Sequence, residues 1–367
     1  MQRFSNPTQS SVRQKCSKVD RRKRANESLL RSGSIESPGS SQRFIVQFSM
    51  KESKIKAKPI HVSRLPSAAR FQLLGLIFCT FALAGCTGGQ VAKTPPPTST
   101  SVRFGHVFVV VEENQSYANV VANPSMPYLN SLANQYGLAT NYFANGHPSI
   151  PNYFELTTGQ QLTIIDALTP RTFPVPDDNV VRELIAAGKI WKSYAEDLPA
   201  VGYTGGDTGN YAVRHNPLAY MTDVQNDAAQ VRNLVPFNQF AADLPTANLP
   251  EYSFIVPNLC NDGHDCPLTT ADNWLKTNID PIIRSPVFQR DGLLIIVFDE
   301  ADLTDFTAGG GHVVAVIVSP LAKRGYKSIA FYQHQSILRL TLEGLGVTKL
   351  PGAAASAPAM WEFFSAP

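Results

Sequence analysis

Apolar residues between positions 103 and 367 alternate between short uninterrupted runs and longer stretches of helical periodicity. Short apolar runs bounded by polar residues are typical of buried strands, whereas stretches with an acidic first turn and a closing glycine are typical of helices. The predicted strands are 106–111, 138–143, 190–194, 252–256, 293–298 and 313–318. The predicted helices are 126–135, a segment ending at 158, 178–187, 227–242, 271–283 and 332–345. This alternation predicts an α/β fold with a mainly parallel central sheet and helices on both faces.

Two of the predicted strands end abruptly in polar and acidic residues. One apolar run leads into Glu113 and Asn114, and another leads into Asp299 and Glu300. Buried parallel strands deliver such side chains to the carboxyl edge of a sheet, where ligand sites lie. Because adjacent side chains on a strand point to opposite faces, Asp299 and Glu300 can share one site only if the chain turns there. The pattern favours hard oxygen ligands at this edge.

Ser149 lies in a turn-rich segment, Gly-His-Pro-Ser-Ile-Pro-Asn-Tyr-Phe over residues 146–154, that leads into the predicted helix closed by Gly159. A hydroxyl at a helix N-terminus lies beside free N–H groups, which favour a bound anion. A hydroxyl nucleophile, oxygen ligands and an anion site together indicate metal-assisted phosphoryl transfer. The alternative is a helix-capping serine, with Thr157 and Thr158 as rival hydroxyls.

Composition divides the chain into four parts. Residues 1–70 carry 16 Lys and Arg against 4 Asp and Glu. They are predicted to be a basic leader that is either disordered or the result of a wrongly assigned gene start. Residues 71–86 hold an apolar run too short to span a bilayer, followed by Leu-Ala-Gly-Cys, and are predicted to be a signal h-region and lipobox. Residues 87–102 are a Pro/Thr/Ser linker, and residues 103–367 form the predicted folded domain.

The lipobox similarity predicts that Cys86 is lipidated. The protein is then an exported bacterial lipoprotein, periplasmic or at the cell surface, and anchored to the membrane through Cys86. The alternative is an ordinary signal peptide that happens to be followed by a cysteine.

Charge and cysteine usage narrow the function classes further. Residues 86–367 contain 16 basic and 25 acidic residues, a formal net charge of −9, and this balance argues against a nucleic-acid partner. After export through an oxidising compartment, Cys260 and Cys266 are predicted to form a disulfide. The alternative, a two-thiolate zinc site, would need two more soft ligands at short spacing, which the sequence lacks.

Six motifs occur in a fixed order along the chain. They are Glu113 with Asn114, residues 147–153, residues 214–217 (Arg-His-Asn-Pro), residues 257–266, residues 298–301 and Gly311 with His312. Together they resemble the bacterial phosphoesterase family, which contains metal-dependent acid phosphatases, phosphatidylinositol-phosphate phosphatases and phospholipase C enzymes within the alkaline-phosphatase-like superfamily. The resemblance covers residues 106–364 and implies an alkaline-phosphatase-like three-layer sandwich, with residues 103–367 as a phosphoesterase catalytic domain.

The resemblance also implies roles for individual residues. The implied metal ligands are Glu113, Asn114, Ser149, Asp299 and Glu300. The implied catalytic residues are Ser149 as the nucleophile, with His215, His264 and His312. The implied substrate-binding residues are Asn114, Asn152, Asn258, Asp262 and Asp265. The alternative for each histidine is a surface or hydrogen-bonded role, and His106 and His334 are predicted to be structural.

The acidic pair Asp299 and Glu300 departs from the Asp-His pair that two-zinc phosphatases carry at this position. The site is therefore richer in oxygen ligands, which favours Mg, Ca or Mn, with Zn as the alternative.

The leading hypothesis is an acid-phosphatase-like phosphomonoesterase that acts through a phosphoseryl intermediate on small metabolites or phosphoinositide headgroups. One alternative is a phospholipase C or another phosphodiesterase. Tyr153 stands where the larger phospholipases commonly carry an arginine, which favours the monoesterase. The other alternative is a non-catalytic, lipid-anchored binding protein. A sulfatase is disfavoured because the Cys-x-Pro-x-Arg signature is missing.

Overall fold

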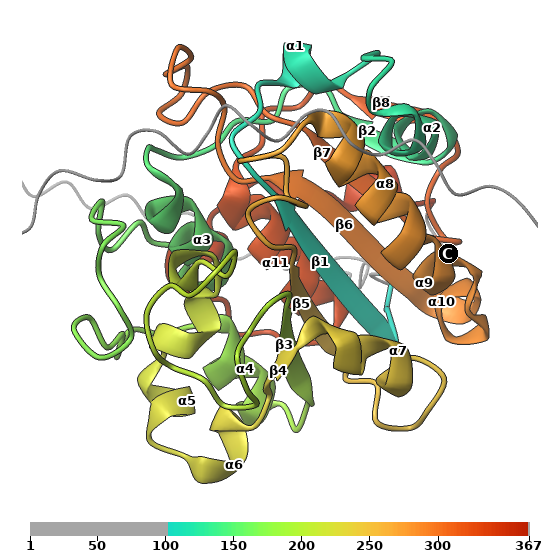
Figure 1. The fold of residues 1–367 in the computed structure, drawn as a ribbon. Coiled ribbons are helices and arrows are strands. Elements are labelled where there is room, and N and C mark those ends of the chain that lie inside the picture. Colours follow the sequence, from blue (N-terminus) through green and yellow to red (C-terminus); the bar gives the residue numbers. More distant parts are fainter. Residues whose placement is uncertain (1–101, 366–367) are drawn as a thin grey trace, which may run out of the picture. The chain divides into compact units, whose positions relative to one another are not determined.

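The computed structural model of the protein describes residues 102–365 (Figure 1). The predictions for the leader, for the signal segment with Cys86, and for the linker up to residue 101 lie outside the described residues. Within residues 102–365, no helix combines the length and the apolar character needed to cross a membrane.

An eight-stranded sheet with the order β4-β3-β5-β1-β6-β7-β2-β8 forms the centre of the domain. All neighbouring strands are parallel except β7, which runs antiparallel to both β6 and β2. The predicted α/β fold with a mainly parallel sheet is therefore confirmed. The strands are β1 (His106–Glu112), β2 (Gly137–Ala139), β3 (Trp191–Ala195), β4 (Leu234–Pro236), β5 (Tyr252–Val256), β6 (Gly292–Phe298), β7 (Ala315–Val318) and β8 (Tyr326–Ser328).

Helices cover both faces of this sheet, which gives three layers. In Figure 1, α8, α9 and α10 lie in front of β6, and α11 lies behind β1 and packs against α3. The helices are α1 (Tyr117–Val120), α2 (Pro127–Gln135), α3 (Ser149–Thr158), α4 (Val180–Ala186), α5 (Thr222–Gln225), α6 (Ala228–Val231), α7 (Phe240–Asp243), α8 (Leu268–Asn278), α9 (Asp280–Arg284), α10 (Pro286–Asp291) and α11 (His334–Gly344).

The two central strands form the core of the domain. Every residue of β6 is buried, and so is β1 from Val107 onward. Because both faces of a parallel sheet are covered, these strands are apolar at successive positions and do not alternate with polar residues. Each fully buried Val, Leu, Ile or Phe contributes roughly 1.5–3 kcal/mol, so the centre of the sheet is a rigid base for the residues that follow it.

Three predicted elements are wrong in extent, and prolines explain two of them. The segment 227–242 is not one helix but α6, the edge strand β4, a short 3-10 turn and α7. Pro236 lacks the N–H that a continuous helix would need. The segment 271–283 is divided into α8 and α9 because Pro281 cannot donate to the preceding turn.

The predicted strand 138–143 also ends early, at Ala139. Beyond it, the side chains of Thr140 and Asn141 donate hydrogen bonds to the carbonyls of Ser328 and Ile329, at 2.6 and 3.2 Å. Past Ala139, pairing continues only as isolated bridges, from Tyr142 to Tyr332 and from Phe143 to His312.

A glycine run brings the loop after β6 against the segment that precedes Ser149. Gly309 and Gly311 have φ values of 113° and 86°, a left-handed conformation that favours glycine. A Cβ atom on Gly310 would lie 2.5 Å from the carbonyl oxygen of Gly146. Only a residue without a side chain fits there, so the run places residues 301–312 next to the catalytic candidate.

Candidate functional site

The ends of β1 and β6 meet at the carboxyl edge of the sheet, as neighbouring parallel strands must. The backbone N–H of Asp299 donates to the carbonyl of Glu112 at 2.9 Å, which extends the ladder past β6. The N–H of Asn114 donates to Asp299 Oδ1 at 3.1 Å. Asn114 has a φ of 54°, a left-handed conformation that asparagine tolerates better than most residues. The chain therefore turns at this point.

Ser149 is the first residue of α3, and its hydroxyl lies between carboxylates from the two strand ends. Its Oγ is 3.1 Å from Glu113 Oε2 and 3.2 Å from Glu300 Oε1, and the residue is 2% exposed. Asp166 Oδ1 accepts the N–H of Ile150 at 3.1 Å, so one free N–H of the helix terminus is already bonded. Three separate elements meet at the serine hydroxyl.

His215 and Asp262 extend the same buried cluster. His215 Nε2 lies 3.2 Å from Glu113 Oε1, and its Nδ1 lies 3.7 Å from Asp262 Oδ2. Glu113, His215 and Asp262 offer ligand atoms within 4.8 Å of one another, and all three are buried. We call the set of Glu113, Ser149, His215, Asp262, Asp299 and Glu300 the acidic cluster.

Two residues that were not predicted as catalytic or ligand residues contact this cluster. The Tyr153 hydroxyl donates a hydrogen bond to Glu113 Oε1, and its ring stacks on His215 with centroids 5.0 Å apart. His147 Nδ1 lies 2.5 Å from Glu300 Oε2. One signal was available: Tyr153 is four residues after Ser149, so it lies on the same face of a helix. For His147 only the proximity to Ser149 in the sequence pointed to the site.

Asn152 supports the loop before Ser149. Its Oδ1 accepts the N–H groups of Asn145 and Gly146, at 3.0 and 3.1 Å, and its Nδ2 donates to the Gly146 carbonyl at 2.7 Å. The structure therefore places this amide within the loop, where it holds the backbone that carries the serine.

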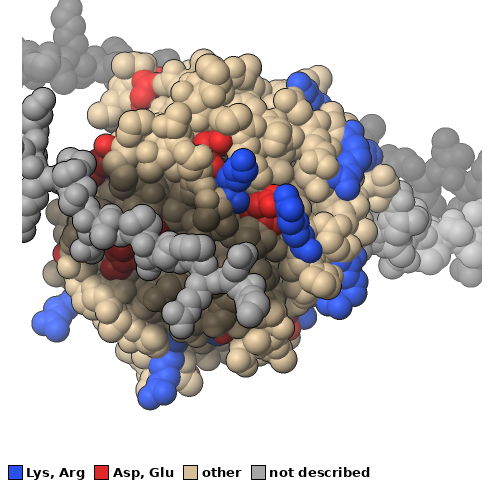
Figure 2. Space-filling model, turned by 45° about the vertical axis from the view of Figure 1, so that its right-hand side comes forward, with Lys and Arg blue, Asp and Glu red and all other residues tan. Residues whose placement is uncertain are grey.

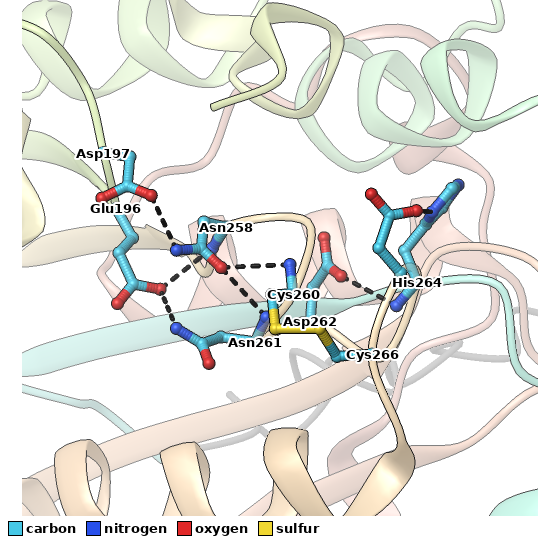
Figure 3. The surroundings of a disulfide bond; sticks show 9 residues. Glu196, Asp197, Asn258, Cys260, Asn261, Asp262, His264 and Cys266 are labelled. Atoms are coloured by element: carbon cyan, nitrogen blue, oxygen red, sulfur yellow. Dashed lines mark hydrogen bonds and ion pairs between the residues drawn. A yellow bond between two sulfur atoms is a disulfide. The ribbon is translucent and has the colours of Figure 1, made fainter. Parts of the chain in front are cut away.

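A disulfide closes the loop after β5, as the sequence predicted (Figure 3). Cys260 and Cys266 are joined with their Cα atoms 4.7 Å apart. The carbonyl of Asp262, within the closed loop, accepts the N–H of Glu113 at 2.8 Å. The loop is thereby bound to the end of β1, which fixes Asp262 beside His215.

Three other predicted residues of this loop lie outside the acidic cluster. The Asn258 side chain donates to Asp197 Oδ2 at 2.8 Å and accepts from the N–H groups of Cys260 and Asn261 (Figure 3). His264 Nδ1 lies 2.6 Å from Asp265 Oδ1, and both side chains are partly exposed.

The remaining histidines also lie outside the cluster. His312 is stacked between Tyr117 and Phe143, at centroid distances of 4.2 and 4.9 Å. His106 Nδ1 lies 2.8 Å from the carbonyl of Pro250.

His334 is buried and acts on the cluster through the backbone. Its Nε2 lies 2.6 Å from the carbonyl oxygen of Asp299, and its Nδ1 lies 2.9 Å from the Tyr142 hydroxyl. Because a carbonyl only accepts, Nε2 carries the proton and Nδ1 accepts from the tyrosine. This bond holds the turn at the end of β6.

The acidic cluster has more negative charge than its surroundings balance. Within residues 102–365, none of its carboxylates forms an ion pair with a Lys or Arg side chain. Burial raises the pKa of Asp299 to about 7, and burial together with the Asp299 charge raises the pKa of Glu300 to about 9. Burial and the Asp299 charge also raise the pKa of Glu113 well above its ordinary value.

Several buried atoms in and beside the cluster also lack a hydrogen-bond partner. Asn114 Oδ1 and Asp299 Oδ2 are buried oxygens with no donor in reach. A buried oxygen without a donor costs free energy, and a bound cation removes both this cost and the charge repulsion. The residues present therefore fit a divalent cation held mainly by oxygen.

A cavity of about 710 Å³ lies farther along the same edge, and no cluster residue lines it. Its walls include Phe237 and Phe240, and Glu196 and Asp197 contribute carboxylates. Figure 2 shows one face of the molecule, on which Lys and Arg side chains and Asp and Glu side chains both occur among mostly other residues. Because no Lys or Arg lines this cavity, it does not suit a phosphate group.

The raised pKa values predict that the stability of the metal-free protein depends on pH. Asp299 moves from 3.8 to about 7 and Glu300 from 4.5 to about 9, so the folded state binds protons more tightly than the unfolded state. Their stabilising contribution is present below about pH 4 and is lost as the pH rises through these folded-state values. We therefore expect the Tm of chelator-treated protein to fall between about pH 5 and pH 9 in thermal melts.

Two controls accompany this measurement. Adding Mg²⁺ or Mn²⁺ should flatten the dependence, and the variant carrying Asp299→Asn and Glu300→Gln should show a weaker dependence than the parent. A Tm of the metal-free parent that does not change with pH would contradict the account of the cluster.

Comparison with known proteins reveals clear relatives. Residues 121–347 match the Phosphoesterase family. The chain is 32% identical over 168 residues to the phosphate-repressible acid phosphatase of Penicillium chrysogenum, a match that covers 44% of this chain and 40% of that protein. It is 36% identical over 217 residues to the phosphatidylinositol-3-phosphatase of Mycobacterium tuberculosis, covering 58% of this chain and 69% of that protein.

A solved structure also aligns with the chain. A protein in the alkaline phosphatase superfamily from Vibrio parahaemolyticus aligns with a TM-score of 0.47 and 14% identity, over 69% of each chain. The matched part spans about two fifths of the Penicillium enzyme's length.

Proposed function

The chain belongs to the Phosphoesterase family, and we propose that it is a metal-dependent phosphoric ester hydrolase that cleaves phosphate monoesters through Ser149. The observation that carries the proposal is the position of Ser149 Oγ, at 3.1 and 3.2 Å from carboxylates of two different strand ends. A buried hydroxyl at the start of a helix, beside uncompensated carboxylates, has the surroundings of an activated nucleophile.

The proposed metal ligands are Glu113, Asn114, Ser149, Asp299 and Glu300. Their donors are oxygens, which favours Mg, Ca or Mn, while the nearby His215 offers the nitrogen that a zinc ion would accept. When bound, a divalent cation lowers the pKa of a coordinated hydroxyl and neutralises charge on phosphoryl oxygens.

The chain's own residues then position and move the reacting groups. Oγ of Ser149 attacks phosphorus while its proton passes to one of the two adjacent carboxylates. The ester P–O bond breaks, and the substrate alcohol takes up a proton and leaves. Water next attacks the phosphoserine, which releases phosphate and restores the hydroxyl. Tyr153 and His147 hold Glu113 and Glu300 in place through the contacts described above.

Replacing the nucleophile tests this mechanism most directly. We expect Ser149→Ala to lower kcat by about 10³-fold or more, while the fold is retained. The measurement is turnover of p-nitrophenyl phosphate, with circular dichroism and thermal melts as checks of folding. Thr157→Ala removes a rival hydroxyl on the same helix and should leave turnover close to that of the parent. A folded Ser149→Ala protein with normal turnover would refute the assignment.

The substrate class is tested by comparing esters. We expect a higher kcat/KM for monoesters, including p-nitrophenyl phosphate and phosphoinositides, than for phosphatidylcholine. The support is that the fungal relative is an acid phosphatase and the mycobacterial relative a phosphatidylinositol-3-phosphatase, together with the tyrosine at position 153. A chelator should abolish activity, and Mg, Mn or Ca should restore it. A clear preference for the diester would favour a phospholipase C.

We also propose that the protein is exported and anchored to a membrane through a lipid on Cys86, on the basis of Leu-Ala-Gly-Cys after the apolar run. Mass spectrometry of the N-terminal peptide of the exported protein should find Cys86 as the first residue, carrying acyl chains. Cleavage at another bond, with Cys86 unmodified, would remove the anchor.

A further inference from the structure

Exposed apolar side chains gather around the candidate site. Ten large apolar side chains are exposed within residues 102–365, and six of them lie on three loops. The loops follow α3, β6 and β8, and the six residues are Ile164, Ile165, Leu303, Phe306, Ile329 and Phe331. We call these six residues the apolar rim. Leu303 and Ile329 are 71% and 84% exposed, so the domain itself gives them little cover.

The loops after α3 and β6 are bonded to the segment that carries Ser149. In the loop after α3, Gln161 donates to the carbonyl of Asn145 at 3.1 Å. In the loop after β6, the carbonyl of Asp305 lies 3.0 Å from His147 Nε2, and Phe306 packs on the His147 ring at 4.7 Å.

The loop after β8 joins the same group. Phe331 stacks on Phe143 with centroids 5.4 Å apart, and Gln333 donates to the carbonyl of Ala308, in the loop after β6, at 3.1 Å. All three loops therefore surround residues 143–150.

We propose that the apolar rim docks onto a lipid bilayer and brings phosphorylated lipid headgroups to Ser149. This inference rests on the proposed function, which it narrows to lipid phosphomonoesters at an interface. Exposed apolar patches of this kind mark interaction sites, and the position of this one decides the partner. A rigid protein seated on the rim would cover the loops around Ser149, whereas a fluid bilayer both accepts the side chains and supplies the substrate.

The chain upstream of the domain is long enough for this orientation. Fifteen residues, 87–101, separate Cys86 from the described domain. Fully extended, they reach at most about 50 Å. The chain enters β1 at the edge opposite the rim, and the seven residues of β1 span roughly 23 Å. An anchor at Cys86 thus allows the carboxyl edge of the sheet to face the same membrane.

Charge indicates how the rim would bind. Residues 160–170, 301–312 and 329–333 contain no Lys or Arg, while Asp166, Asp302 and Asp305 lie among them. Attraction to anionic lipid is therefore weak in these segments, with Arg171 just beyond the first of them, and insertion of apolar side chains is their main driving force. Binding should persist in high salt and should not increase with phosphatidylserine.

The experiment uses the chain from residue 86 onward with Cys86→Ser, which contains every described residue and removes the lipid. The rim variant carries Leu303→Ser and Ile329→Ser, neither of which contacts the acidic cluster. The matched control carries Ile185→Ser, at an exposed position in the last turn of α4, and Ile190→Ser, at an exposed position just before β3 and at the opposite edge of the sheet. Flotation with phosphatidylcholine vesicles containing phosphatidylinositol 3-phosphate measures binding without reference to activity.

We expect the rim variant to lose at least about tenfold in vesicle binding and in kcat/KM on the vesicles, while p-nitrophenyl phosphate turnover stays close to that of the parent. The control variant should match the parent in vesicle binding, in kcat/KM on the vesicles and in p-nitrophenyl phosphate turnover. Equal vesicle binding by the rim variant and the parent, or binding that requires phosphatidylserine, would overturn the proposal. The proposal would also be overturned if light scattering showed the parent to be a dimer and only the rim variant to be a monomer. The rim would then be a contact between two copies of the chain. If the parent did not turn over p-nitrophenyl phosphate, that result would instead count against the proposed function.

Discussion

The burial of several carboxylates without a Lys or Arg side chain to balance them is the constraint on which the rest of the described domain depends. Such charges are costly in a protein interior unless protons or a cation compensate them. Each carboxylate must also be held close to the others against their repulsion. The most rigid part of the domain, the pair of central strands β1 and β6, supplies the ends from which Glu113, Asp299 and Glu300 project.

A second layer of contacts holds these groups in place, and each contact comes from a different part of the chain. His334 on α11 binds the backbone at Asp299, and Tyr153 on α3 binds Glu113. The disulfide-closed loop fixes Asp262 against the end of β1. The proposed chemistry needs little movement of these groups, since the serine hydroxyl already lies within hydrogen-bond distance of two carboxylates.

The strands were predictable from sequence where burial on both faces leaves a continuous apolar run with a polar end. Strand β5 was predicted with its observed limits, and β1 and β6 to within one residue. Two helices failed because their apolar periodicity continued through Pro236 and Pro281, where the backbone cannot.

In the candidate site too, residues marked by a local sequence pattern were predictable, and contacts that depend on packing were not. Glu113, Ser149 and the acidic pair after β6 were singled out because local patterns mark strand ends and helix starts. The contacts of Tyr153 and His147 depend on how α3 packs against those ends, which no local pattern encodes. Asn152 and Asn258 satisfy nearby backbone groups, a use of asparagine that sequence alone does not separate from ligand binding.

The pairing of β1 also determines at what point during synthesis and folding the site can form. Val107 pairs with Tyr252 on one side and with Leu293 on the other, across 145 and 186 residues of sequence. Such distant pairings form slowly, because the entropy cost of closing a long loop must be met before the stabilising contacts form. A growing chain that has not yet reached Asp299 has no β6 beside β1 and lacks the acidic pair. The proposed chemistry therefore cannot begin before the chain has been synthesised past Glu300 and β6 has paired with β1.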